Sequence, residues 1–200
     1  MTDYDVRLAD QSDFEALAAL FERDNSPCYC RYWHFAGTNK EWEARCGLTP
    51  EVSRAELGAA LASKSDESLG LVARVPGHGL IVGWMKLAPQ HTLSKLLKRS
   101  PYKGLEAPEV FSIGCFLVDA DHRRKGVARA LLEGAIAVAP SLGARALEAY
   151  PRVFDGLHDF ELWNGPFEMF QALGFEVVRD QPQYPVMRKS LTSNLTSPRT

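Results

Sequence analysis

The sequence predicts one domain of mixed α-helices and β-strands, and three observations carry this prediction. Segments with the alternation of strands are interspersed with segments of helical periodicity along most of the chain. A length of 200 residues suits one domain with a short appended segment. A composition of 46% hydrophobic and 24% charged residues is ordinary for a globular protein, which excludes disordered, collagenous and coiled-coil chains. We expect one domain over residues 1–189 and a flexible tail, rich in Ser and Thr, over residues 190–200.

The N-terminal third predicts a strand followed by helices. Residues 4–8 alternate as a short strand, and capping residues precede apolar positions at helical spacing over residues 14–21. Residues 28–35 are dense in aromatic side chains without a clean period, so we expect a loop or an irregular helix there. A Thr-Pro-Glu start and apolar residues on one face predict a helix over residues 50–63.

The middle of the chain predicts a hairpin, a buried strand and a helix. Residues 69–75 and 80–87 have strand character and flank a four-residue turn with two glycines. Residues 110–118 are apolar on both faces, as a central strand requires. The period then changes, and residues 127–138 have the spacing of an amphipathic helix that ends before a proline.

The last part of the chain predicts further strands around a short helix. Residues 144–150 have strand character and precede a long connection over residues 151–163. A short helix over residues 167–173 is closed by a glycine, and strands follow at residues 175–178 and 184–187.

The loop after the central strand is the strongest candidate for a functional site. It contributes the charges of Arg123, Arg124 and Lys125 just before the helix, where the first N–H groups lack intrahelical partners. Gly126 and Ala128 would let a diphosphate approach the backbone, although a solvated basic turn would have similar residues. The loop matches neither the phosphate-binding loop of NTPases nor the dinucleotide-binding glycine motif.

These residues resemble the GNAT superfamily of N-acetyltransferases, whose cofactor loop follows (Q/R)-x-x-G-x-(G/A). Arg123-Arg-Lys-Gly-Val-Ala128 fits this motif, and Phe116-Leu-Val118 is similar to the strand that precedes it in the family. Phe170-Gln-Ala-Leu-Gly-Phe175 is similar to the family's final helix and its entry into the next strand, and Tyr184-Pro-Val-Met-Arg188 is similar to a closing strand. The resemblance is specific over residues 110–132 and extends over 144–190.

The resemblance implies a splayed, mixed and mostly antiparallel sheet with helices on both faces, and direct acetyl transfer from acetyl-CoA to an amine. Loop amides would bind the pyrophosphate, and backbone groups of Phe116 and Val118 would pair with the pantetheine amides. The cofactor-binding residues that it implies are Phe116, Leu117, Val118, Arg123, Arg124, Lys125, Gly126, Val127, Ala128, Arg129, Asn164 and Phe170. Of these, Asn164 could instead cap the final helix.

The sequence departs from the family at the catalytic positions. Ser112 stands where histone-modifying members carry a glutamate base, and Glu109 is expected at the strand edge or surface. Phe170 stands where many members have a tyrosine acid, so Tyr150 is the substitute that we expect to act with Ser112 in catalysis. An ordinary half-buried tyrosine is the alternative for Tyr150.

The cysteines offer little support for a metal site. Cys28-x-Cys30 with His34 lacks a second closely spaced pair, and Cys46 and His91 are isolated, so we expect no metal. The surrounding segment contains aromatic residues that could form either a local hydrophobic cluster or one wall of the acceptor site: Tyr29, Tyr32, Trp33, Phe35 and Trp42.

The net charge, the cysteines and the N-terminal sequence limit the partners and the location that we expect. The formal net charge is −2, so general binding to nucleic acid or to a membrane surface is not expected. The scattered cysteines and the absence of a signal-peptide pattern predict a cytoplasmic protein. We expect an acetyl-CoA-dependent N-acetyltransferase, as a monomer or homodimer, acting on a small-molecule or peptide amine. The alternative is a non-catalytic acyl-CoA-binding sensor or regulatory module.

Overall fold

The fold is built on a seven-stranded sheet. The computed structural model describes residues 4–105, 107–156, 158 and 161–191. The strands follow the order β1-β2-β3-β4-β5-β7-β6, and every neighbouring pair is antiparallel except β4 and β5, which run parallel. Their bounds are β1 (Asp5–Leu8), β2 (Gly70–Arg74), β3 (Ile81–Pro89), β4 (Val110–Val118), β5 (Ala146–Ala149), β6 (Glu176–Arg179) and β7 (Val186–Ser190).

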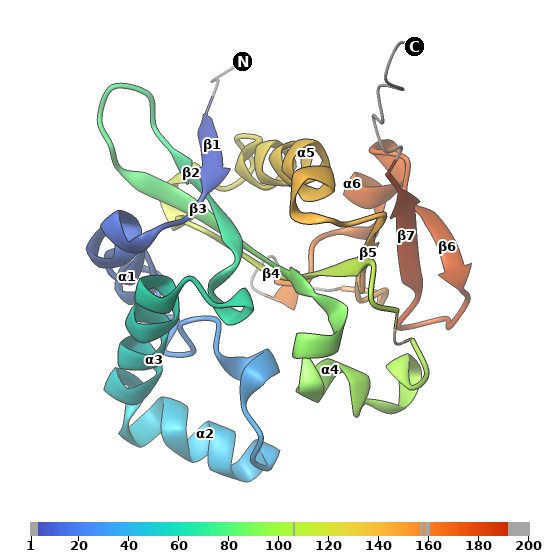
Figure 1. The fold of residues 1–200 in the computed structure, drawn as a ribbon, viewed down its shortest axis with the longest axis horizontal. Coiled ribbons are helices and arrows are strands. Elements are labelled where there is room, and N and C mark those ends of the chain that lie inside the picture. Colours follow the sequence, from blue (N-terminus) through green and yellow to red (C-terminus); the bar gives the residue numbers. More distant parts are fainter. Residues whose placement is uncertain (1–3, 106, 157, 159–160, 192–200) are drawn as a thin grey trace, which may run out of the picture.

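Helices cover both faces of this sheet (Figure 1). The helices are α1 (Phe14–Arg23), α2 (Asn39–Leu48), α3 (Pro50–Ser63), α4 (Ser94–Leu97), α5 (Val127–Val138) and α6 (Phe167–Ala172). In Figure 1, α1, α2 and α3 lie together on one side of the sheet, whereas α5 lies beside β1 and β2 and α6 lies beside β7.

Alternation along the strands separates two large cores, and the described residues form a third apolar cluster around Trp33, Tyr102 and Tyr150. In β2, Leu71 and Ala73 face one core together with side chains of α5 and α6, while Val72 faces the other core with α1 and α3. Leu131 of α5 and Leu17 of α1 are fully buried in these two cores. The mixed fold with helices on both faces, predicted above, is confirmed.

The helix α2 was not predicted from the sequence. Among its residues only Trp42 is buried, so it lacks the apolar stripe that marks a core-facing helix. A capping box begins it instead: the Thr38 hydroxyl oxygen accepts from the Glu41 N–H at 3.2 Å, and the Thr38 N–H donates to the Glu41 carboxylate at 2.7 Å. The short helix α4 was also missed, within the basic stretch after β3.

The C-terminal end requires two corrections. The predicted strand at residues 184–187 begins two residues later, at Val186, and continues to Ser190. Ser190 pairs with Ala146 of β5, so it belongs to the sheet and not to the predicted tail. Residues 192–200 of that tail lie outside the described residues.

Candidate functional site

The parallel pair β4 and β5 separates shortly after it begins. The register joins them only at Val110 to Ser112, while β4 continues to Val118. On the open edge of β4, the N–H of Phe116 donates to the carbonyl of Trp163 at 2.6 Å. The connection after β5 therefore occupies part of the edge that a fully paired neighbouring strand would have used.

A β-bulge lies at the same place in β4. Met85 of β3 pairs with Phe116 and Leu87 pairs with Ile113, so β4 advances three residues while β3 advances two. Such an extra residue bends a strand and redirects its side chains, and bulges are common next to active sites. The carbonyl of Gly114, within the bulge, accepts a hydrogen bond of 3.0 Å from the indole N–H of Trp33.

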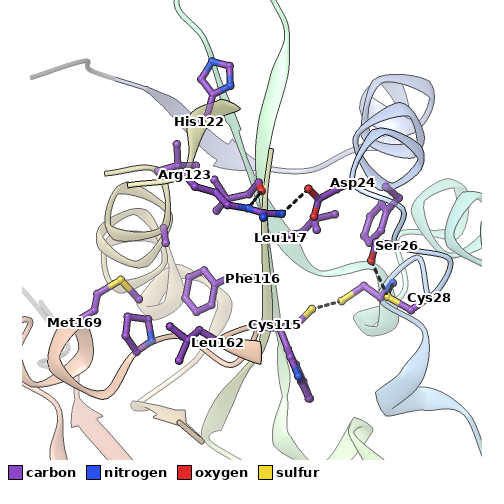
Figure 2. A pocket seen from close by; sticks show the side chains of 18 of the residues that line it. Asp24, Ser26, Cys28, Cys115, Phe116, Leu117, His122, Arg123, Leu162 and Met169 are labelled. Atoms are coloured by element: carbon purple, nitrogen blue, oxygen red, sulfur yellow. Dashed lines mark hydrogen bonds and ion pairs between the residues drawn. The ribbon is translucent and has the colours of Figure 1, made fainter. Parts of the chain in front are cut away.

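A cavity of about 690 Å³ surrounds the open half of β4. Figure 2 shows Phe116, Leu162 and Met169 on one side of the strand and Asp24, Ser26 and Cys28 on the other. The lining is contributed by the segment after α1, by β4, by the start of α5 and by the connection that leads to α6. The cavity thus joins the basic loop to the aromatic segment.

The start of α5 presents backbone donors to this cavity. Its first helical hydrogen bond runs from the Ala130 N–H to the Gly126 carbonyl at 2.9 Å, so the N–H groups of Val127, Ala128 and Arg129 precede it and have no acceptor within the helix. Gly126 has a φ of +87°, which favours glycine, and no atom would lie within 4 Å of an added Cβ. Backbone donors at the positive end of a helix, facing open space, form an anion-binding site.

Arg123 serves mainly to hold this loop in place. Its Nε donates to the Val118 carbonyl at 3.1 Å, and its Nη2 donates to the Asp24 carboxylate at 2.6 Å (Figure 2). Burial raises the pKa of Asp24 above its usual value, although the Arg123 charge opposes that rise. The other basic side chains that line the cavity near the helix are His122, Arg124 and Arg129.

Aromatic side chains form the wall at the other end of the cavity. Trp33 is 1% exposed, and its ring centroid lies 4.9 Å from that of Tyr32 and 5.6 Å from that of Trp163. Trp42 packs edge to face against Tyr32, with ring centroids 5.5 Å apart. All four rings line the cavity, so the aromatic segment is at once a hydrophobic cluster and part of the wall.

A buried polar network lies where β4 and β5 separate. The hydroxyls of Ser112 and Tyr150 are 2.7 Å apart, and the Tyr150 hydroxyl donates to the Glu148 carboxylate at 3.0 Å. Gln90 Nε2 donates to the Tyr150 hydroxyl at 3.0 Å, and Arg188 Nε donates to Glu148 at 2.9 Å. Burial first, and then the Glu148 charge, raise the pKa of Tyr150 well above its usual value, so the phenol keeps its proton.

The family of this chain follows from its match to a known family of proteins. The model of the acetyltransferase (GNAT) family matches residues 14–156, which include most of both cores, the bulged strand and the loop before α5. The chain belongs to the GNAT acetyltransferase family. A search of curated proteins finds no match for it.

Solved GNAT structures share the fold of this GNAT chain at low identity. The protein yncA from Salmonella typhimurium, assigned as an acetyltransferase and solved with its cofactor acetyl-CoA, is 19% identical. It covers 95% of this chain and 95% of its own, with a TM-score of 0.57. The PaiA N-acetyltransferase from Thermoplasma acidophilum, in complex with coenzyme A, is 14% identical with a TM-score of 0.55, covering 94% of this chain and 99% of its own. A GCN5-related N-acetyltransferase from Kribbella flavida is 23% identical with a TM-score of 0.55, covering 94% and 98%.

Most of the predicted cofactor-binding residues of this GNAT chain line the cavity. They are Phe116, Leu117, Val118, Arg123, Arg124, Gly126, Val127, Ala128 and Arg129. Lys125 is exposed beside it, and its carbonyl accepts from the Tyr4 hydroxyl at 3.3 Å. Phe170 is fully buried against Phe116 and Phe175, and it packs in the core and not at the cavity surface.

Asn164 does not cap the final helix. The N-cap of α6 is Pro166, which offers no capping side chain, so this part of the expectation is wrong. Asn164 is 3% exposed, and its amide oxygen has no hydrogen-bond partner among the described residues. Asn164 is not among the residues that line the cavity. Its role in binding the cofactor therefore stays a prediction.

The predicted catalytic pair is brought together but lies away from the cavity. Ser112 and Tyr150 are both fully buried, and neither lines the cavity. Their catalytic assignment stays a prediction, and it now requires a proton path from the buried network to the cavity. Glu109 lies at the surface, as expected, where its side chain is 57% exposed and pairs with Arg145 at 3.1 Å.

Several residues of the site were missed by reading the sequence. Glu148 and Gln90 complete the buried network, while Asp24, Ser26, Leu162, Trp163 and Met169 line the cavity. Strand alternation gave no sign that a glutamate in β5 would be buried, because its partner Arg188 comes from β7. Trp163 is the last residue of the predicted connection, and the dense aromatic composition of residues 28–35 was the only related signal.

Within the described part of the chain, no group of three or more His, Cys, Asp or Glu side chains is arranged to hold a metal ion. None of the helices in this part is both long enough and apolar enough to cross a bilayer.

His34, beside the aromatic wall, should make the protein sensitive to acid. Its Nδ1 lies 3.1 Å from the Thr92 carbonyl, which can only accept, while its buried Nε2 has no hydrogen-bond partner among the described residues. Burial, followed by the charges of Lys86 and Arg31, lowers the pKa of His34 to about 3. The unfolded chain, with a pKa near 6.5, therefore binds a proton that the folded protein does not, and stability falls as the pH drops below 6.5.

We expect His34→Gln to remove about 2 kcal/mol of the stability loss that wild type shows between pH 7 and pH 5. Denaturant unfolding at the two pH values measures this difference. His78→Gln, in the exposed turn between β2 and β3, is the matched control and should retain the wild-type pH dependence. If the free energy of unfolding depended equally on pH in wild type and His34→Gln, His34 would not be the source of the acid sensitivity.

Proposed function

We propose that this GNAT protein transfers the acetyl group of acetyl-CoA directly to an amine of a small molecule or peptide. The single observation that supports this most is the continuity of one cavity from the N–H donors at the start of α5 to the aromatic wall around Trp33. A cosubstrate with a diphosphate at one end and a thioester at the other suits such a cavity. Acetyl-CoA and coenzyme A in the yncA and PaiA structures support the same choice.

The residues present suit the phosphate end of acetyl-CoA. The N–H groups of Val127, Ala128 and Arg129 would bind phosphate oxygens, and the open space beside Gly126 leaves room for them. The Arg124 and Arg129 side chains would add positive charge at the cavity surface. The fixed backbone donors supply specificity, because they cannot rotate away from the ligand.

In β4, the two backbone groups expected to bind the pantetheine arm of acetyl-CoA already have hydrogen-bond partners. The Phe116 N–H is already bonded to Trp163, and the Val118 carbonyl already accepts from Arg123. A carbonyl oxygen can accept a second hydrogen bond, so Val118 remains available to a pantetheine amide. Phe116 would need to release Trp163 first.

The acceptor would enter along the aromatic wall. The partly exposed rings of Tyr32 and Trp163, backed by the buried rings of Trp33 and Trp42, offer an apolar surface. Such a surface suits a small or apolar amine better than a polycation. The amine must lose a proton before it attacks, since an alkylammonium of pKa about 10.4 is almost entirely protonated at pH 7. The wall and the bulge at Gly114 would place the nitrogen beside the open half of β4.

The engaged Phe116 N–H and the position of Tyr150 away from the cavity favour one second candidate, a non-catalytic acyl-CoA sensor. Such a module would bind the thioester and change shape without reacting. The acetyltransferase would release CoA from acetyl-CoA in the presence of an amine, whereas the sensor would not.

The release of CoA from acetyl-CoA should therefore be measured chromatographically with a panel of aromatic, aliphatic and peptide amines. We expect release that depends on at least one amine, together with a product heavier by one acetyl group. Tight calorimetric binding of acetyl-CoA without release across the panel would favour the sensor. Absence of binding would contradict both candidates.

A further inference from the structure

Thiols from two distant segments meet in the wall of the cavity. Cys30, which follows α1, and Cys115, in the bulge of β4, are 85 residues apart in sequence, yet their Sγ atoms lie 2.7 Å from each other. Both line the cavity, and a dashed line marks the contact at Cys115 in Figure 2. Cys28 lines the same wall.

The backbone holds each sulfur in position. Tyr29 and Cys30 both have positive φ angles, 42° and 56°, a conformation that non-glycine residues adopt at some cost and that tertiary contacts must maintain. The Trp33 indole anchors the same segment to β4 through the Gly114 carbonyl at 3.0 Å. The two thiols are therefore adjacent because of packing on both sides and not because of a flexible loop.

The surroundings of the pair favour one thiolate. Burial opposes ionisation of Cys30, but the hydrogen bond from Cys115 and the charges of Lys86 and Arg31 outweigh burial and lower the pKa of Cys30. The Cys115 pKa is raised well above its usual value, first by its hydrogen bond to Cys30 and then by burial. A thiol whose pKa is lowered, beside one whose pKa is raised, supplies the attacking and the resolving sulfur that favour stepwise oxidation to a disulfide.

We propose that Cys30 and Cys115 form a redox-active dithiol, which a peroxide converts into an intramolecular disulfide in the wall of the cavity. In the first step the Cys30 thiolate attacks hydrogen peroxide, an S–O bond forms, the O–O bond breaks, and the departing hydroxide takes up a proton to become water. In the second step the Cys115 thiol attacks the sulfenic sulfur, the S–S bond forms, and the S–O oxygen leaves as a second water. Two thiols lose two electrons and two protons, and the peroxide is reduced.

Disulfide formation does not depend on the proposed function, whereas one consequence does. The disulfide would fix the segment after α1 to β4 beside the place where cosubstrate and acceptor meet. We therefore expect oxidised protein to release CoA more slowly than reduced protein. Chemical mapping and turnover are measured separately, so that failure of one is distinguishable from failure of the other.

The test uses the full chain, reduced, desalted and treated with one equivalent of hydrogen peroxide. We expect the protein to lose two of its four titratable thiols. Tryptic mapping should link the peptide of residues 24–31 to that of residues 104–123. The oxidised protein should melt at a higher temperature than the reduced protein, because the link constrains the unfolded chain, and dithiothreitol should reverse the shift.

Two variants provide controls. Cys46→Ser, outside the cavity wall, should form the same link as wild type. Cys115→Ser should form no link between these peptides, and its Cys30 should react with dimedone as a sulfenic acid. The wild-type map stands without either variant, should one fail to fold. A link between Cys28 and Cys30, or a Cys115 that stays reduced while Cys30 reaches the sulfinic acid, would overturn the proposal.

Discussion

Ala128→Glu is expected to lower the affinity for CoA by at least about 100-fold, equivalent to about 3 kcal/mol. Ala128 lies in the first turn of α5, lines the cavity, and has an N–H with no acceptor in the helix. A glutamate there would fill the space that phosphates need and would repel their charge. The helix itself should tolerate the change, since a carboxylate in the first turn interacts favourably with the helix dipole.

Ala137→Glu is the matched control for this substitution. It adds the same side chain to the same helix, at an exposed position that does not line the cavity. Isothermal titration calorimetry with CoA should give wild-type affinity for Ala137→Glu and no measurable binding for Ala128→Glu. Both variants should keep a wild-type circular dichroism spectrum. Comparable affinity in the two variants would remove the start of α5 from the binding site.

Glu148→Ala is expected to lower the free energy of unfolding by about 3–5 kcal/mol. Glu148 is fully buried and accepts hydrogen bonds from Arg188, Gln90 and Tyr150. Its removal leaves a guanidinium and two neutral donors without their common acceptor, at the point where β4 and β5 separate. Denaturant unfolding measures the loss.

Glu133→Ala is the control, because Glu133 is 51% exposed and pairs along α5 with Arg129 at 2.9 Å. Its unfolding free energy should stay within about 0.5 kcal/mol of wild type. A similarly small loss for Glu148→Ala would mean that the buried network contributes little to stability.

The same network decides the catalytic assignment of Tyr150. Tyr150→Phe removes one hydroxyl and should cost about 1–3 kcal/mol of stability, because Ser112, Gln90 and Glu148 each lose a partner. A fall in kcat of at least about tenfold, at a temperature where the variant is folded, would support a role in proton transfer. An unchanged kcat would leave Tyr150 a structural member of the network.

Local patterns predicted the parts of the site that depend on neighbouring residues. The apolar run of β4, the change of period at Val127 and the basic loop between them all lie within about twenty residues. Strand ends, helix starts and their unpaired N–H groups follow from such short segments. For the same reason the bounds of β4 agreed with the structure at both ends.

Long-range pairing produced the features that could not be predicted. Glu148 alternates along β5 like a solvent-facing residue, and its burial is explained by hydrogen bonds from Arg188 of β7, from Gln90 just after β3 and from Tyr150. The contact between Cys30 and Cys115 depends on how the segment after α1 packs under the bulge. The bulge arises from the register of β3 with β4, which no periodicity within β4 reveals.

The hydrogen bond between the Phe116 N–H and the Trp163 carbonyl makes ligand binding a competition within the chain. A ligand that uses this donor must find the connection already released or must displace it. Its apparent dissociation constant is then the intrinsic constant divided by the fraction of molecules in which the donor is free. Substitutions at residues 161–166 that stiffen or loosen this contact would therefore tune affinity and residence time without altering any residue that touches phosphate.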